Sequence, residues 1–234
     1  MPPNYARRSS EKPVAKLIRR PRHATGAEQT HAPGGMVSQR RSHRRVEAQD
    51  LAGHQKKAQK EGRTIVFIDE SGLSQRPHRC RTWAPRGQTP VLQYHFNWKT
   101  ISVAAGMTFW NFYFQIFDKA VGKEETVLFL AHLLQHIAGP LLIVWDRLPA
   151  HRSRLVGEFL DACQGQIVVE YLPPYAPELN PVEYLWGYWK HHQLPNVCAK
   201  DFWQLSDGAR RTLRRLRRRP RLITAFCKQA SLFA

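Results

Sequence analysis

Two runs of apolar residues, each ending in an aspartate, constrain the fold of this chain more than any other feature. Asp69 follows four consecutive apolar residues in TIVFIDE, and Asp146 follows five in PLLIVWD. Unbroken runs of this kind are typical of strands covered on both faces, as in the middle of an α/β sheet. A carboxylate at the end of such a strand is costly unless it is paired or binds a metal ion. Both aspartates are therefore candidate functional residues.

A third acidic residue, Glu183, lies at the predicted start of a helix. The apolar strand IVVEYL runs into two prolines and a loop, and then into the sequence NPVE, which ends at Glu183. Asparagine is a favoured N-cap, proline is favoured at the first helical position, and a glutamate three residues after the cap completes a capping box. On its own, Glu183 can be a simple cap of its helix or a functional carboxylate held just after a strand.

Taken together, the three acidic residues have the donor chemistry of a divalent-cation site. Mg²⁺ prefers hard oxygen ligands, which two strand-end aspartates and one helix-start glutamate supply. The pattern therefore predicts a metal site formed by Asp69, Asp146 and Glu183. Glu70 is a weaker candidate, because the residue after Asp69 on a strand points to the opposite face. Glu178 precedes the predicted cap and is also weaker.

The order of predicted elements indicates an α/β fold. Three strands, the last two forming a hairpin, are followed by alternating helices and strands, which is the order of the ribonuclease-H-like fold. We therefore expect a central mixed five-stranded sheet with helices on both faces. The predicted strands are 63–70, 99–107, 111–118, 140–146 and 166–172, and the predicted helices between them are 122–138 and 152–163.

The net charge of +18 is concentrated at the two ends of the chain. Residues 1–60 carry 14 Lys and Arg against 4 acidic residues, and residues 208–234 carry 9 against none. The stretch between them, 61–207, carries 13 against 14. A near-neutral centre with two basic ends is typical of a globular domain flanked by segments that bind a polyanion such as DNA.

This charge distribution and the element pattern predict three regions. Residues 1–57 are basic, with few aromatic residues and no sustained periodicity, so we expect a poorly ordered segment. It is either a remnant or frameshifted stretch, or a basic arm that lies along phosphates. Residues 58–200 form the α/β domain, and residues 201–234 form two basic helices, split at Pro220, that pack on it.

The cysteine pattern and hydropathy predict a soluble cytoplasmic protein, associated with the nucleoid. The four cysteines contain no CxxC pair, so neither a zinc ribbon nor a disulfide framework is indicated. Residues 1–10 are polar and contain prolines, unlike a signal peptide. The longest apolar stretch, 127–145, is interrupted by histidines, a glutamine and a Gly-Pro pair, which argues against a membrane span.

Three motifs together resemble a known family. The sequences FIDES, WDRLPAHRS and LPPYAPELNPVEYLW resemble those of the DDE transposases of the Tc/mariner superfamily, in its bacterial insertion-sequence branch. The resemblance covers roughly residues 61–234, and the third motif is the most specific. Position by position, it puts the catalytic triad on Asp69, Asp146 and Glu183, with 36 residues between the last two, close to the usual gap in that family. Arg147 departs from the wider family, which often has a small or amide residue there.

The resemblance also implies a reaction and its cofactors. It implies two Mg²⁺ or Mn²⁺ ions per active site, with Asp69 bridging both, Asp146 binding one and Glu183 the other. The implied reaction is hydrolysis of DNA phosphodiesters at transposon ends, followed by attack of the freed 3′-hydroxyl on target DNA. By analogy the protein would act as a homodimer on DNA. Helix-turn-helix modules, which the family uses to recognise element ends, are not evident in 1–57.

Several basic residues are candidates for contact with DNA. Arg147 and Arg152 lie in the second motif, close to Asp146, and His151 matches a histidine that recurs in the family motif. His151 can orient a phosphate, or it can serve as a helix-cap residue. In the tail, Leu213 and Leu216 predict a helix that docks one edge on the domain and offers its arginines to phosphates, although a solvated basic face has the same pattern. These arginines are Arg210, Arg211, Arg214, Arg215 and Arg218.

Two other functions fit the sequence. The chain can be a transposase remnant that binds DNA without cutting it, or a different ribonuclease-H-like nuclease, such as a resolvase or an RNA–DNA hybrid hydrolase. The intact set of three acidic residues favours catalysis over decay. The stretch APELNPVEYLW favours a transposase over the other nucleases.

Overall fold

The computed structural model describes residues 53, 56–94, 99–174, 176–230 and 232. Nearly all of the predicted N-terminal segment, 1–57, lies outside these residues, so its predicted character stays a prediction.

A mixed five-stranded sheet forms the centre of the fold, with the strand order β3-β2-β1-β4-β5. β1, β2 and β3 are antiparallel neighbours, whereas β4 runs parallel to β1 on its other side and β5 runs parallel to β4. This order confirms the predicted ribonuclease-H-like α/β fold. The strands are β1 (Thr64–Ser74), β2 (Thr100–Met107), β3 (Phe112–Phe117), β4 (Leu141–Trp145) and β5 (Ile167–Tyr171).

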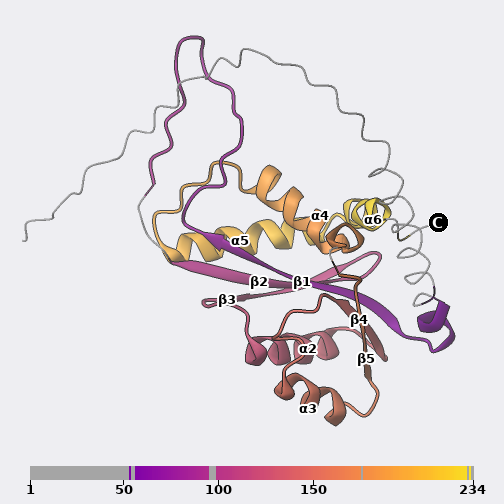
Figure 1. Ribbon diagram of the computed structural model, residues 1–234. Coiled ribbons are helices and arrows are strands. Elements are labelled where there is room, and N and C mark those ends of the chain that lie inside the picture. The colour runs from indigo at the N-terminus through magenta and orange to yellow at the C-terminus, as the bar shows by residue number, and fades with distance from the viewer. Residues whose placement is uncertain (1–52, 54–55, 95–98, 175, 231, 233–234) are drawn as a thin grey trace, which may run out of the picture.

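Helices cover both faces of the sheet, as predicted (Figure 1). Two lie on one face: α2 (Lys123–His136) and α3 (Arg154–Ala162). Three lie on the other: α4 (Pro181–Tyr188), α5 (Phe202–Arg217) and α6 (Pro220–Gln229). A short 3₁₀ turn, η1 (Pro177–Leu179), precedes α4, and a π-helical turn, η2 (Trp189–Gln193), extends it. Within the described part of the chain, no helix has the length and apolar character needed to cross a membrane.

The two layers of helices enclose two separate apolar clusters, because successive side chains of a strand point to opposite faces. Phe67 of β1 and Val144 of β4 belong to the cluster under α4, α5 and α6. Their chain neighbours Ile68 and Trp145 belong to the cluster under α2 and α3. This alternation explains why the central strands are apolar at every position.

The first strand is longer than predicted, since β1 continues to Ser74 rather than ending at residue 70. Its antiparallel partner β2 stays beside it as far as the pair Ser74 and Thr100, whereas its parallel pairing with β4 stops at Phe67 and Val144. Asp69 therefore lies not at the end of β1 but just beyond the point where β1 loses β4 as its neighbour. In the described part of the connection to β2, the structure has one isolated bridge, between His78 and Pro195.

The C-terminal helices are joined to the sheet by an apolar edge of α5. Its buried residues recur at helical spacing and are Leu205, Ala209, Leu213 and Leu216. The indole N–H of Trp189, in η2, donates a hydrogen bond of 2.8 Å to the hydroxyl of Thr212 in α5. Pro220 begins α6, so the predicted split between the two helices is confirmed.

We expect Leu213→Ala to lower the free energy of unfolding of the whole domain by about 2–5 kcal/mol, because it leaves a cavity at a fully buried position. Urea denaturation followed by circular dichroism measures this change. The control Leu155→Ala, on α3, removes a side chain that is 37% exposed and should cost about 0.5 kcal/mol or less. A main transition unchanged by Leu213→Ala would mean that the tail is not part of the cooperative unit.

Candidate active site

The sheet places the two predicted aspartates side by side. Phe67 and Val144 are paired across β1 and β4, and both face the α4 layer. Asp69 and Asp146 each follow two residues later, so their backbones lie at the same level of neighbouring strands. The carboxylate of Asp146, which comes just after β4, contacts His151 on the α2 and α3 side of the sheet. Strand register thus brings the backbones of two of the three predicted metal ligands side by side.

The third ligand, Glu183, is positioned by the side chain of Asn180. The amide nitrogen of this buried asparagine donates a hydrogen bond of 3.0 Å to the backbone carbonyl of Ile68, the residue before Asp69. Its amide oxygen accepts a bond of 3.1 Å from the backbone N–H of Val182, which caps α4. One side chain therefore fastens the start of α4 to β1, and it holds the first helical turn, with Glu183, beside Asp69.

The predicted capping box between Asn180 and Glu183 is not what the structure shows. The backbone N–H of Asn180 donates to the carbonyl of Pro177 at 2.9 Å, within the turn η1. This N–H is already satisfied, so the carboxylate of Glu183 is not needed as its acceptor. Glu183 is exposed to solvent. The interpretation of Glu183 as a mere cap of its own helix is therefore wrong.

Asp69 lies in a strongly negative environment. Burial raises the pKa of its carboxyl group, and the nearby charges of Glu183 and Glu70 raise it further, to about 8. The indole N–H of Trp186 donates a hydrogen bond of 2.8 Å to Asp69 Oδ2, which acts in the opposite direction but does not outweigh them. A carboxyl group that holds its proton at neutral pH because of burial and of nearby carboxylates is one that a bound cation would ionise.

The pKa of Asp146 is shifted in the opposite direction, because a histidine forms an ion pair with its carboxylate. His151 Nδ1 lies 2.9 Å from Asp146 Oδ1, and His151 Nε2 lies 3.1 Å from Glu70 Oε1. Burial alone would lower the pKa of His151, but these two carboxylates raise it to about 9. Burial would likewise raise the pKa of Asp146, yet the bonds from His151 and from the backbone N–H of Leu148 bring it below its ordinary value.

The imidazole of His151 is enclosed between protein groups. It is 3% exposed, and its ring stacks on the indole of Trp145 with the centroids 4.2 Å apart and the planes 1° from parallel. Glu70 points to the α2 and α3 side of the sheet, as its position next to Asp69 predicts, and there it meets His151. In this structure His151 therefore orients two carboxylates, and its predicted contact with a phosphate stays a prediction.

Two residues of the site were missed by sequence reasoning, and both follow Glu183 on the same helical run. Trp186 is three residues further on, a spacing that shares one helix face, and it bonds Asp69. Lys190 is half-buried, and although burial lowers the pKa of its ammonium group, the charges of Glu183 and Asp69 act to raise it. The helical spacing from Glu183 could have identified Trp186, whereas Lys190 depends on the π-helical turn.

The donor set suits a divalent metal ion. Asp69, Asp146 and Glu183 offer carboxylate oxygens, which are hard ligands preferred by Mg²⁺ and Mn²⁺. Both bonds to the carboxylate of Asp146 are accepted by Oδ1, so Oδ2 is left to turn toward an ion. The mutual repulsion that raises the pKa of Asp69 is the unfavourable energy that a cation would relieve.

The predicted DNA-contacting arginines are exposed. Arg147 and Arg152 lie in the loop after β4, where the Arg147 guanidinium carbon is 5.8 Å from the centre of the Tyr171 ring. Four of the tail arginines lie on α5, which covers the same sheet face as α4, and Arg218 directly follows that helix. One of them, Arg211, forms an ion pair of 3.0 Å with Asp207. All five are exposed: Arg210, Arg211, Arg214, Arg215 and Arg218.

Comparisons with known proteins give a consistent picture. Residues 64–206 match the family described as DDE superfamily endonuclease. No curated protein matches this chain. Among solved structures, the mariner Mos1 paired end complex with Mg aligns with a TM-score of 0.60 and 16% identity, over 89% of this chain and 65% of that one. The Mos1 strand transfer complex aligns with a TM-score of 0.52 and 17% identity, over 90% and 68%.

The Mos1 transposase paired-end complex with left transposon end is also similar, with a TM-score of 0.53 and 17% identity, over 86% of this chain and 66% of that one. At these identities the likeness is one of fold. The chain spans about two thirds of the length of these three structures.

Without divalent metal, we expect Asp69→Asn to stabilise the protein increasingly as the pH rises from 3.8 to about 8. The folded state keeps a proton on Asp69 that the unfolded chain releases, so wild-type stability falls with pH over this interval, by up to about 1.4 kcal/mol per pH unit. The asparagine removes this penalty. Urea denaturation of both proteins below and above this interval measures the difference.

Asp146→Asn is the matched comparison, because it changes the neighbouring strand by the same substitution. It should destabilise the protein, since the lowered pKa of Asp146 and the raised pKa of His151 both reflect a favourable ion pair. This pair contributes stability that is lost as the pH rises through about 9. Equal effects of the two substitutions would contradict the opposite electrostatic characters of the two aspartates.

Proposed function

This chain belongs to the DDE superfamily endonucleases, and from that premise we propose that it is the catalytic part of a DNA transposase. The proposed reaction is metal-dependent hydrolysis of phosphodiesters at transposon ends, followed by transfer of the freed 3′-hydroxyl to target DNA. The three sequence motifs support placing it in the bacterial insertion-sequence branch of the Tc/mariner superfamily, acting on nucleoid DNA.

One observation carries the proposal more than any other. The hydrogen bond of 2.8 Å from Trp186 of α4 to Asp69 of β1 holds this helix, with Glu183 in its first turn, against the strand, although Asp69 and Glu183 are 114 positions apart in the chain. The strand register brings the backbone of Asp146 to the same level of the sheet as Asp69. A fold does not gather like charges for stability, so their proximity supports a function that requires a cation.

We assign Asp69, Asp146 and Glu183 as the ligands of two Mg²⁺ or Mn²⁺ ions, with Asp69 shared between them. When bound, such ions activate a water or 3′-hydroxyl nucleophile and stabilise the leaving oxygen of the phosphodiester. Support for the use of metal comes from the donor set and from the Mos1 paired end complex that was solved with Mg.

The surrounding residues orient these ligands. Trp186 fixes the carboxylate of Asp69 through its indole N–H, and His151 fixes that of Asp146 while Glu70 holds its other ring nitrogen. Such outer partners set the direction and basicity of metal ligands. Lys190 brings a positive charge to the same place. It is a candidate to bind the phosphate next to the scissile bond.

DNA is the proposed partner. The Mos1 neighbours include complexes with paired ends and with a left transposon end. In this chain, the exposed arginines of α5 lie on the same face of the sheet as the acidic site. DNA that reaches the acidic residues would therefore pass close to a helix rich in positive charge. We further propose that two copies of the chain act together on DNA, as a homodimer.

The chain should nick supercoiled plasmid DNA in the presence of Mg²⁺ or Mn²⁺, and each of Asp69→Asn, Asp146→Asn and Glu183→Gln should reduce nicking by more than about 100-fold. Loss of a metal ligand should reduce activity by more than the about 10- to 100-fold that is typical when a residue that only hydrogen-bonds to a ligand is lost. Trp186→Phe, which removes the hydrogen bond to Asp69 and shortens a buried ring, should reduce nicking by about 10- to 100-fold.

Asp118→Asn is the control for these substitutions, because Asp118 is an exposed acidic residue just after β3. Its nicking rate should equal that of the wild type. Tight DNA binding with no nicking by any of these proteins would instead identify a remnant that binds but does not cut. Nicking that survives all three ligand substitutions would place the chemistry elsewhere.

Binding of the chain to duplex DNA should weaken when Arg210→Gln and Arg214→Gln are combined. If each arginine contacts one phosphate, the slope of log affinity against log salt should become less steep by about 1.8. The matched control combines Lys123→Gln and Arg154→Gln, which removes the same charge from exposed positions on the opposite, α2 and α3, side. Fluorescence anisotropy over a range of salt measures both slopes, and equal changes would contradict an α5 interface.

A further inference from the structure

Three metal-binding side chains meet on the flank of the domain. His78 Nε2 lies 3.4 Å from His191 Nδ1, and Cys80 Sγ lies 3.6 Å from the same nitrogen. One donor atom of each residue lies within 4.8 Å of the other two. His78 and Cys80 belong to the connection after β1, whereas His191 lies in η2, 111 residues after Cys80. Within the described residues, no other set of three His, Cys, Asp or Glu side chains has its donor atoms this close together.

The backbone around this group is held in place from both sides. Asn196 accepts a hydrogen bond from the backbone N–H of Cys80 at 2.9 Å and returns one to the Cys80 carbonyl at 3.1 Å. Its own backbone N–H donates to the carbonyl of His78 at 2.9 Å, and Pro195 bridges to His78. The turn that carries the first two ligands is thus fixed to the segment after η2.

His191 reaches the group because the helix changes its winding. After α4 the chain continues as the π-helical turn η2, in which each residue turns less about the axis than in an α-helix. Such turns are frequent at functional sites. Here the wider turn sets the direction of His191, whose ring meets that of His78 edge to face, with the centroids 4.5 Å apart.

The donor chemistry selects a different metal from the acidic site. Imidazole nitrogen and thiolate sulfur are borderline to soft ligands that favour Zn²⁺, whereas Mg²⁺ prefers oxygen. Three protein ligands leave the fourth position of a tetrahedral ion to water or another donor.

We propose that His78, Cys80 and His191 form a second metal site, which binds one Zn²⁺ ion through two imidazole nitrogens and a thiolate. Binding releases the thiol proton of Cys80 to solvent, and the sulfur then coordinates the ion. The ion joins the connection after β1 to the end of the α4 helical run. This site does not depend on the proposed transposase function.

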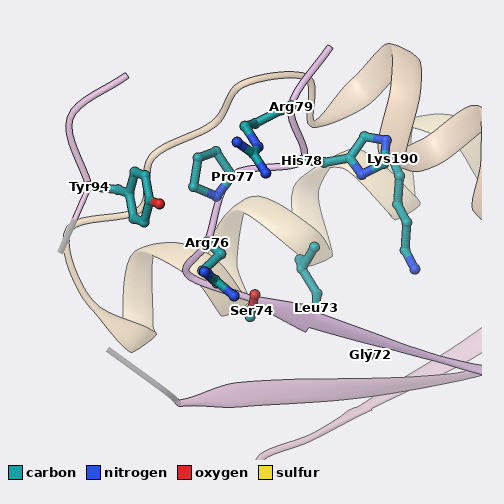
Figure 2. A pocket seen from close by; sticks show the side chains of 9 residues that line it. All are labelled: Gly72, Leu73, Ser74, Arg76, Pro77, His78, Arg79, Tyr94 and Lys190. Carbon is teal, nitrogen blue, oxygen red and sulfur yellow. The ribbon is translucent and has the colours of Figure 1, made fainter. Parts of the chain in front are cut away.

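The position of the site gives the ion a structural role. His78 and Lys190 line the same surface cavity, of about 330 Å³, with Arg76, Arg79 and Tyr94 (Figure 2). Lys190 precedes His191 in η2 and is in electrostatic contact with Asp69 and Glu183. An ion on His191 would therefore fix the turn that carries Lys190 beside the acidic site.

Cobalt is the probe that tests this site, because Co²⁺ substitutes for Zn²⁺ and absorbs light. Titration of the metal-free full chain with Co²⁺ should give a thiolate-to-cobalt charge-transfer band that saturates at one ion per chain, and added Zn²⁺ should abolish it. Carboxylate ligands give no such band, so Co²⁺ in the acidic site does not contribute. Cys80→Ser should abolish the band, and His191→Ala should weaken Zn²⁺ binding by more than about 100-fold.

Cys163→Ser is the matched control, since Cys163 is a half-buried thiol at the end of α3. It should keep the band of the wild type. Far-ultraviolet circular dichroism shows whether each variant is folded, and His78→Ala replaces Cys80→Ser if the latter is not. Absence of the band in the wild type, or its persistence in Cys80→Ser, would overturn the proposal and leave a hydrogen-bonded cluster without metal.

Discussion

The arrangement of the acidic site depends on the buried hydrogen bond from Asn180 to the carbonyl of Ile68, which connects the start of α4 to β1. Asp69 and Asp146 are fixed relative to each other by strand register, but α4 arrives from a different part of the chain. A single side chain caps this helix and binds it to the strand, directly before Asp69. Because both functions belong to one amide, the helix cannot start elsewhere without leaving a buried polar group unsatisfied. The position of Glu183 follows from this connection between α4 and β1.

The two aspartates illustrate two ways of treating a carboxylate inside a fold. Asp146 has a cationic partner, His151, which is itself held by Glu70 and by stacking on Trp145. Asp69 has a neutral donor, Trp186, and its burial together with two acidic neighbours raises its pKa to about 8. The protein thus keeps one of the two proposed ligands ordered and ionised, whereas burial and acidic neighbours oppose ionisation of the other. A bound cation would relieve this opposition, which is an expected trade-off between stability and function.

The fold and the acidic residues could be predicted because they depend on local pattern. Apolar runs such as LLIVW mark strands buried on both faces, and the acids after them stand out by contrast. What the sequence could not show depends on contacts between distant segments. The bond from His151 to Glu70 and the meeting of Cys80 with His191 join residues 81 and 111 positions apart. The capping box failed for a similar reason, since η1 already satisfies the cap N–H of Asn180.

The two tryptophans of the α4 helical run have a mechanical consequence. Their rings lie 5.7 Å apart, and each donates its indole N–H to a different element: Trp186 to Asp69 on β1, and Trp189 to Thr212 on α5. The arginine-bearing helix α5 and the proposed metal ligand Asp69 are thereby attached to the same short helical run. A movement of α5 would therefore reach the carboxylate of Asp69 through the two indole hydrogen bonds and the contact between the two tryptophan rings. In the proposed function, a shift of α5 on binding DNA would therefore change the position of the Asp69 carboxylate.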